Sequence, residues 1–300
     1  DGDVTAQDLS LDLQVRPEPG LGRPGAQVSA VRYRSAEGGE VSALLVAPEG
    51  PPGALASSSS IGASATGRRS WEARAIAQAG GVALCLDAPG YGERRVGKGP
   101  PNLFSADVAR ALFLQCISDI QRGVSALVAI PGVDSSRIAY IGHSLGATIG
   151  ATAIARESRL CAAILMAGYG RPSSRWPLLP SRSYASKVAE LDGLRNVQGF
   201  APRPLLLQFG TQDEFITQAD ADELVAAAPG AEVGRFALDH ALEGEARLQR
   251  LSWLGGKLGL ELQAPEEGLP PSQLAEYRRI APVARTLGRF QRFVERITGA

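Results

Sequence analysis

Short apolar runs, each bounded by glycine, aspartate or proline, recur between residues 82 and 238. Each run has the length of a β-strand, and its apolar residues are nearly continuous instead of alternating with polar ones. Such continuity is typical of strands that are buried on both faces of a parallel sheet. The pattern predicts strands at residues 82–87, 137–142, 161–167, 204–210 and 232–238.

Between these runs, apolar residues follow a helical spacing. The longest helical segment is predicted at residues 106–129, and Pro131 ends it. Its apolar face consists of Val108, Leu112, Ile117, Ile120, Val124 and Leu127. Further helices are predicted at residues 69–79, 148–156, 218–228 and 242–258. Strands that alternate with helices predict an α/β fold, with a mostly parallel sheet covered by helices on both faces.

The predicted domain spans residues 27–263 and begins with two strands, at residues 27–34 and 41–47. Residues 1–26 are acidic and then rich in proline and glycine, which predicts an extended N-terminal arm. Residues 264–300 predict a C-terminal helical extension that docks on the domain. The alternative is that this helix mediates dimerisation, which would make the protein a homo-oligomer.

Residues 169–204 separate two predicted strands and form too long a segment for a simple connection. We consider two interpretations of this segment. It is either a partial lid over the functional site or a surface excursion with a short helix.

Composition narrows the class of partner. Lys and Arg together number 31, as do Asp and Glu, so charge gives no support for a nucleic acid or an anionic membrane as partner. No apolar run approaches the ~20 residues that a membrane span needs. The chain starts at Asp1 without methionine or a visible signal peptide. We therefore expect a soluble protein with a small-molecule substrate, either cytoplasmic or exported with its signal already removed.

The cysteines and histidines give little support for a disulfide framework or a metal site. The three cysteines are odd in number and show no paired spacing. Only two histidines are present, His143 and His240, and no cluster has the spacing of metal ligands. We expect no bound metal.

The strongest chemical motif is Gly142-His143-Ser144-Leu145-Gly146, a G-x-S-x-G sequence between a predicted strand and a predicted helix. A strand-to-helix turn this tight requires Ser144 to adopt a positive φ, and the two glycines prevent clashes around it. The turn would expose the serine hydroxyl beside the free N–H groups of the helix N-terminus. This context predicts a nucleophile elbow with Ser144 as the nucleophile.

A serine nucleophile needs a neighbouring base, and histidine has a suitable unperturbed pKa of ~6.5. His143 is adjacent to Ser144 in the chain and cannot curl back onto its neighbour's hydroxyl. His240 follows a predicted strand and precedes a helix. By elimination, His240 is the predicted general base.

The third member of a triad would be a carboxylate that orients the histidine. Asp213 follows the predicted strand 204–210 and is the expected residue, with Glu214 as its rival. Asp239 is adjacent to His240 and therefore poorly placed to orient it. Asp220 and Asp222 are expected within the next helix.

These features together resemble an α/β-hydrolase, and more narrowly the esterase branch related to dienelactone hydrolases, acetyl xylan esterases and prolyl-oligopeptidase catalytic domains. The resemblance covers roughly residues 27–260, with the closest stretches at residues 82–93, 119–127, 131–146 and 205–216. The order Ser…Asp…His also matches this family. The resemblance implies an eight-stranded sheet, carboxylic-ester substrates and no cofactor.

The chain departs from its relatives at the loop that supplies part of the oxyanion hole. Ile61-Gly62 stands where the relatives have His-Gly, so Ala63 is the expected N–H donor, with Leu145 as the second. The preceding strand contains four serines, Ser57 to Ser60, whose hydroxyls would need partners if buried. Tyr91 and Trp176 are further candidates for lining the substrate pocket.

The sequence therefore predicts a serine carboxylic ester hydrolase that forms a covalent acyl-enzyme on small to medium acyl esters. Peptidase, amidase, thioesterase and lactonase activities remain alternatives, because the same triad can serve each of them. A non-catalytic ligand-binding protein on the same fold is a further alternative.

Overall fold

The computed structural model describes residues 13–17, 25–49, 55–62, 71–97, 101–175 and 181–263. Within these residues, nine strands form a single sheet in the order β1-β2-β3-β5-β4-β6-β7-β8-β9. The strands are β1 Gln14–Pro17, β2 Gln27–Arg34, β3 Glu40–Ala47, β4 Leu55–Gly62, β5 Val82–Asp87, β6 Val133–His143, β7 Leu160–Met166, β8 Leu205–Gly210 and β9 Glu232–Phe236.

The sheet is mostly parallel, as the apolar runs predict. The pairings of β1 with β2, β2 with β3 and β3 with β5 are antiparallel, and the five pairings from β5 through β4 to β9 are parallel. The resemblance implied eight strands. The ninth is β1, which lies in the predicted N-terminal arm and pairs with β2 at the edge of the sheet. An edge position tolerates Pro17, which has no N–H to donate.

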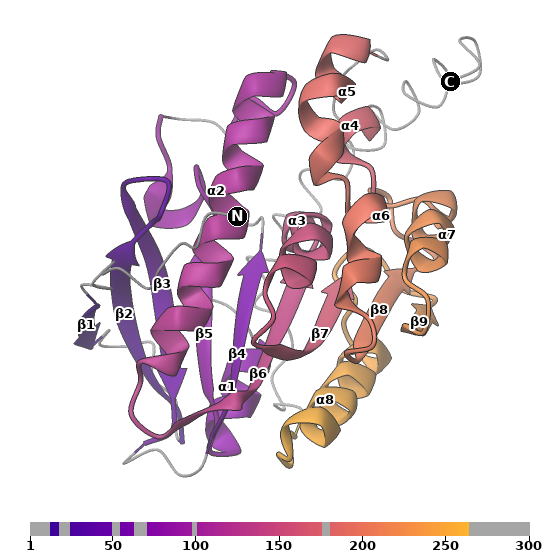
Figure 1. Cartoon of the computed structure of the whole chain (residues 1–300). Coiled ribbons are helices and arrows are strands. Elements are labelled where there is room, and N and C mark those ends of the chain that lie inside the picture. Colours follow the sequence, from indigo (N-terminus) through magenta and orange to yellow (C-terminus); the bar gives the residue numbers. More distant parts are fainter. Residues whose placement is uncertain are drawn as a thin grey trace.

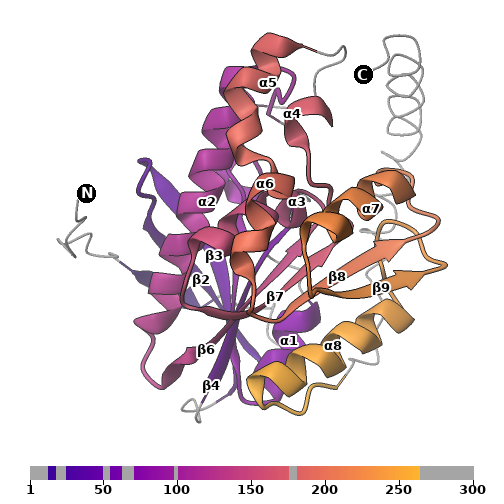
Figure 2. The same cartoon turned by 45° about the vertical axis from the view of Figure 1, so that its right-hand side comes forward.

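Helices cover both faces of the sheet (Figure 1). The helices α1, Trp71–Gln78, and α8, Glu245–Leu258, pack on one face. Figure 2 shows these two helices side by side. The other face carries α2, Ala106–Val128, and α3, Leu145–Ala153, which also pack against each other. The helix α7, Gln218–Ala227, contacts the short helix α6, Gly193–Asn196.

Several boundaries differ from the predicted ones. The strand β6 begins four residues before the expected position 137, at Val133. The helix α3 begins at Leu145, immediately after the serine, whereas the predicted start was residue 148. A 3₁₀ turn at Ile154–Arg156 follows it. Val108, predicted on the buried face of α2, is 40% exposed. This residue belongs to the first turn of α2, and the first turns of this helix project beyond the ends of the strands (Figure 1).

The segment 169–204 contains helical pieces within its described part: α4, Pro172–Arg175, α5, Arg182–Val188, α6, and 3₁₀ turns at Ala189–Leu191 and Val197–Phe200. The helix α5 packs against the first turns of α2. Tyr184 donates a hydrogen bond to the Leu103 carbonyl (2.8 Å), and Lys187 pairs with Asp107 (2.7 Å). The interpretation of this segment as a lid stays a prediction. Trp176 and the predicted extension 264–300 lie outside the described residues.

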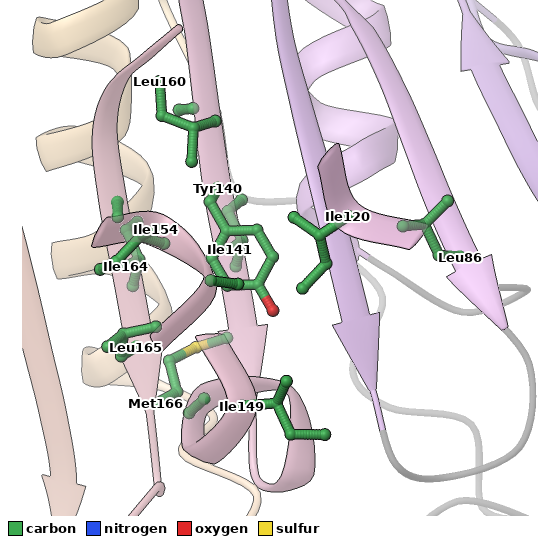
Figure 3. Close-up of a cluster of buried hydrophobic side chains, with 14 of the residues drawn as sticks. Leu86, Ile120, Tyr140, Ile141, Ile149, Ile154, Leu160, Ile164, Leu165 and Met166 are labelled. Carbon is green, nitrogen blue, oxygen red and sulfur yellow. The ribbon is translucent and has the colours of Figure 1, made fainter. Parts of the chain in front are cut away.

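A cluster of buried side chains fills the space around the central strands (Figure 3). Tyr140 of β6 has no exposed surface and lies in this cluster, with Ile120 of α2 and Leu165 of β7. A Cβ added at Gly150 of α3 would lie 2.5 Å from the Tyr140 ring, so α3 packs directly on that ring. This contact fixes the position of α3, and therefore of its N-terminus, relative to β6. No helix in the described ranges is long and apolar enough to cross a membrane.

Candidate active site

Ser144 occupies the one position between β6 and α3. Its backbone has φ +55° and ψ −114°, a conformation that costs energy for a residue with a Cβ. A Cβ added at Gly142 would lie 2.6 Å from the Gly146 carbonyl oxygen, so only glycine fits at Gly142. The strained turn that the G-x-S-x-G motif predicts is therefore present.

Hydrogen bonds to neighbouring segments keep this turn in place. The Ser144 N–H donates to the Met166 carbonyl at the end of β7 (2.9 Å), and the Thr148 N–H donates to the Ser144 carbonyl (2.9 Å). The Tyr140 hydroxyl donates to the Gly146 carbonyl (2.8 Å). Sequence reasoning missed this role of Tyr140. The one available signal was a tyrosine in a buried strand, where its hydroxyl must find a partner.

His240 lies between Ser144 and Asp213. Its Nε2 is 2.9 Å from the Ser144 Oγ, and its Nδ1 is 2.8 Å from the Asp213 Oδ2. A carboxylate can only accept, so Nδ1 carries the proton, and in the neutral imidazole Nε2 is left to accept from the serine hydroxyl. The side chains of His240 and Asp213 are 7% and 1% exposed. The three residues therefore form a largely buried hydrogen-bonded chain that ends at the serine.

The loops that carry Asp213 and His240 follow neighbouring parallel strands, β8 and β9. Two backbone bonds join them. Thr211 donates to the Phe236 carbonyl (2.7 Å), and Gln212 donates to the Leu238 carbonyl (3.0 Å). Asp213 is therefore brought next to His240 by the pairing of adjacent strand ends.

The backbone after Asp213 also orients its carboxylate. The Asp213 Oδ1 accepts N–H bonds from Phe215 (2.7 Å) and Ile216 (3.0 Å), which leaves Oδ2 facing His240.

Other acidic candidates have separate roles. Asp220 forms a capping box with Thr217 at the start of α7, and Asp222 pairs with Arg235 (2.5 Å). Asp239 accepts the N–H of Ala241 (3.0 Å).

His143 faces the loop of His240. Its Nε2 lies 2.7 Å from the His240 carbonyl oxygen, and the two rings are 5.0 Å apart. Because a carbonyl oxygen only accepts, the Nε2 of His143 must carry a proton and donate. Burial, with a smaller contribution from His240, lowers the pKa of His143 to about 4, so this imidazole is neutral near pH 7. Sequence reasoning excluded His143 as the base but did not anticipate this bond.

Phe215 also contacts His240, through its ring, and was not predicted from the sequence. Its ring centroid is 4.6 Å from that of His240, with the planes tilted by 43°. The signal for this contact was an aromatic residue two positions after the candidate acid.

The structure describes one of the two predicted oxyanion-hole donors, Leu145. Leu145 is the first residue of α3, so its N–H has no acceptor within the helix. Gly62, the last residue of β4, pairs with His143 of β6, so β4 ends beside the serine turn. Ala63 lies outside the described residues.

Tyr91 belongs to the loop after β5. It is partly buried, and burial, with a smaller contribution from nearby Cys116, raises the pKa of its phenol. Its backbone bonds are with Ala88 and Arg94. Its place in a substrate pocket stays a prediction.

Comparisons with known proteins place this geometry in context. No protein-family model matches the sequence, and no curated protein sequence matches it. Among solved structures, an acetyl xylan esterase from Paenibacillus sp. R4 superposes with a TM-score of 0.66 at 18% identity, over 84% of this chain and 89% of that one. Acetyl xylan esterase 1 from Thermoanaerobacterium sp. superposes with a TM-score of 0.66 at 15% identity, over 82% and 88%.

A larger enzyme shares the same architecture. Prolyl oligopeptidase B from Galerina marginata superposes with a TM-score of 0.58 at 14% identity, over 80% of this chain but only 38% of that one. These superpositions, together with the strand order and the strand-to-helix turn at Ser144, show that the chain has the α/β-hydrolase fold.

Proposed function

We propose that this protein is a serine hydrolase that cleaves carboxylic esters through a covalent acyl-enzyme. The observation that carries the proposal is the hydrogen-bonded chain from the Ser144 Oγ through the His240 imidazole to the Asp213 carboxylate. The base lies within hydrogen-bond reach of the hydroxyl, and the carboxylate fixes the tautomer that can accept the proton.

The reaction begins with acylation. The Ser144 Oγ attacks the ester carbonyl carbon while His240 Nε2 takes the hydroxyl proton. Negative charge develops on the carbonyl oxygen, which receives hydrogen bonds from the N–H groups of Leu145 and Ala63. As the C–O bond to the alcohol breaks, His240 returns its proton to the leaving oxygen. Asp213 stabilises the transient imidazolium without becoming protonated.

Deacylation repeats these steps with water. His240 removes a proton from a water molecule, which attacks the acyl carbon, and Ser144 leaves with that proton restored. The reaction consumes one ester and one water and yields one acid and one alcohol. None of these steps needs a redox group.

Two considerations favour uncharged esters with small acyl groups, one for the acyl group and one for the charge. The two acetyl xylan esterases match this chain over most of their own length, whereas the prolyl oligopeptidase matches over a minor part of its length. The balance of 31 basic and 31 acidic residues suits an uncharged or weakly charged substrate. Short-chain acyl esters are therefore the first substrates to test.

The test replaces the nucleophile. Ser144→Ala should lower kcat for p-nitrophenyl acetate and butyrate by at least about 10⁴-fold, because each triad member is needed for the same step. Ser252→Ala is the matched control, since Ser252 is an exposed residue of α8, and its activity should equal that of the wild type.

A fluorophosphonate probe should label the wild type and Ser252→Ala at Ser144 and leave Ser144→Ala unlabelled. Undiminished turnover in Ser144→Ala would overturn the assignment. A folded wild type that neither turns over these esters nor reacts with the probe would instead indicate a binding protein. Faster cleavage of a peptide p-nitroanilide than of any ester would favour a peptidase.

A further inference from the structure

The loop that carries His240 is held at two of its carbonyl oxygens. The His240 carbonyl accepts the Nε2–H of His143 at 2.7 Å, and the Leu242 carbonyl accepts Nη1 of Arg250 at 2.6 Å. The two donors come from different parts of the fold, the end of β6 and the helix α8. The backbone at His240 and two residues after it is therefore attached to two separate elements.

The loop needs such attachments because part of it is strained. Leu242 is fully buried and has φ +51°, which a branched side chain rarely adopts. Conformations of this kind persist only where surrounding contacts over-determine them. Arg250 is itself fixed by Glu72 of α1, whose Oε1 lies 2.6 Å from its Nε. The bond from Arg250 to the Leu242 carbonyl holds the loop after His240, and the bond from His143 holds the loop at His240 itself.

From this arrangement we infer that His143 is a positioning residue for the general base, an inference that rests on the proposed function. His143 and Ser144 are consecutive, so the backbone that places the nucleophile also places the donor that holds the His240 carbonyl. The distance from the Ser144 Oγ to the His240 Nε2 is thereby set by a local link, in addition to the Asp213 contact. The hydrogen bond of His143 goes to the His240 backbone carbonyl, not to the imidazole that receives the proton.

A neutral donor suits this position. In the part of the chain that the structure describes, the charges of His240, Arg250 and Asp213 act on His143. A permanent cation here would lie close to an imidazole that must itself become positively charged during acylation, and like charges repel at this range. A lysine or arginine would supply the hydrogen bond but oppose proton transfer, whereas a neutral imidazole or an amide supplies the bond alone.

The test uses a matched pair of substitutions. His143→Gln places an amide N–H near the position of Nε2, and His143→Met has similar size without a donor. For p-nitrophenyl butyrate, His143→Met should lower kcat about 10- to 100-fold, because a misplacement of about 1 Å can cost that much, while KM changes by less than about twofold. His143→Gln should stay within about threefold of the wild type in kcat. The rate of fluorophosphonate labelling of Ser144 should follow kcat in all variants.

A purely structural role would lower the melting temperature and leave the catalytic rates of the folded fraction unchanged. Equal kcat and equal labelling rates in His143→Met and the wild type would therefore overturn the inference. Equal losses in the Gln and Met variants would overturn it as well, because the hydrogen bond would then not be the cause. Absence of ester turnover and of labelling in the wild type is a different result, which contradicts the proposed function itself.

A measurement on the wild type covers the case in which the variants do not fold. With ¹⁵N-labelled histidine, the two histidines give two imidazole spin systems in long-range ¹H–¹⁵N spectra. His143 should be the neutral Nε2–H tautomer from pH 7 down to pH 5. The Nδ1–H tautomer, or an imidazolium at pH 6, would overturn the inference.

Discussion

His143 and Ser144 are consecutive, yet their side chains contact different atoms of one distant residue. Ser144 faces the His240 imidazole, and His143 faces the His240 carbonyl. The two histidines therefore have opposite chemical requirements. In the proposed mechanism, His240 takes up and releases a proton during turnover, whereas His143 keeps its Nε2 proton and remains neutral.

This difference predicts how stability depends on pH. The pKa of His143 is about 4 in the folded protein and ~6.5 in an unfolded chain, so between these values the unfolded state binds the extra proton. Stability therefore falls as the pH drops from about 6.5 towards 4, and this loss should amount to about 2 to 3 kcal/mol.

The measurement is urea unfolding of the wild type and His143→Gln at pH 7 and pH 4.5. Other titrating groups are common to both proteins and cancel in the comparison. The stability advantage of the wild type over the variant should shrink, or reverse, at the lower pH. A difference that is the same at both pH values would contradict this prediction.

At the scale of elements, a buried ion pair joins α1 to α8. Glu72 is 8% exposed and Arg250 is 3% exposed, and their atoms lie 2.6 Å apart. Burial by itself raises the pKa of Glu72, but the charge of Arg250 and its hydrogen bond lower the pKa below its ordinary value. The same arginine donates to the Leu242 carbonyl, so the packing of two helices on one sheet face is coupled to the loop of the candidate active site.

Breaking this pair should be costly. Glu72→Gln leaves the buried charge of Arg250 without its main partner, which should lower the free energy of unfolding by about 3 kcal/mol. The matched control is Glu190→Gln, which breaks the pair between Arg110 and Glu190, where both side chains are more than 40% exposed. An exposed pair contributes at most about 1 kcal/mol, so the control should change stability little. Urea denaturation measures both variants, and equal losses would contradict the argument.

At the scale of the whole molecule, the parallel strands bring the candidate catalytic residues together beyond the carboxyl ends of the sheet. Ser144, Asp213 and His240 follow the carboxyl ends of β6, β8 and β9, and β6 is near the centre of the sheet. Ligands in open α/β sheets bind outside the carboxyl ends of the strands. The helices α4 and α5 also rise beyond these strand ends, and α5 lies beside α2 (Figure 2).

Charge is a second property of the whole molecule. The chain has 31 basic and 31 acidic residues and an isoelectric point near 7.0. A protein without net charge lacks the repulsion that keeps molecules apart in solution. Solubility at low ionic strength should therefore be lowest near pH 7 and rise at pH 5.5 and pH 9. Precipitation by polyethylene glycol across this range measures it, and a steady trend in one direction would disagree with this expectation.

Local pattern was sufficient for most elements of the fold. The strands Gln27–Arg34 and Val82–Asp87 have the predicted bounds, and α2 ends one residue before its predicted end. Each of these elements depends on hydrophobic periodicity and on the glycine or proline that bounds it, which the sequence contains directly. The turn at Ser144 could be predicted for the same reason, because the two glycines that make room for it lie within five consecutive residues, Gly142 to Gly146.

The sequence by itself determined the strand and helix pattern, the serine turn and the short list of bases, since only two histidines exist. Only the tertiary structure decided that Asp213 orients His240, that Tyr140 and His143 support the site, and that residues 14–17 add an edge strand. The contacts of Asp213 and His143 depend on which strand ends become neighbours in space, and the edge strand depends on its pairing with β2. His143 and His240 are 97 residues apart, and no local pattern along the chain encodes a hydrogen bond across that separation.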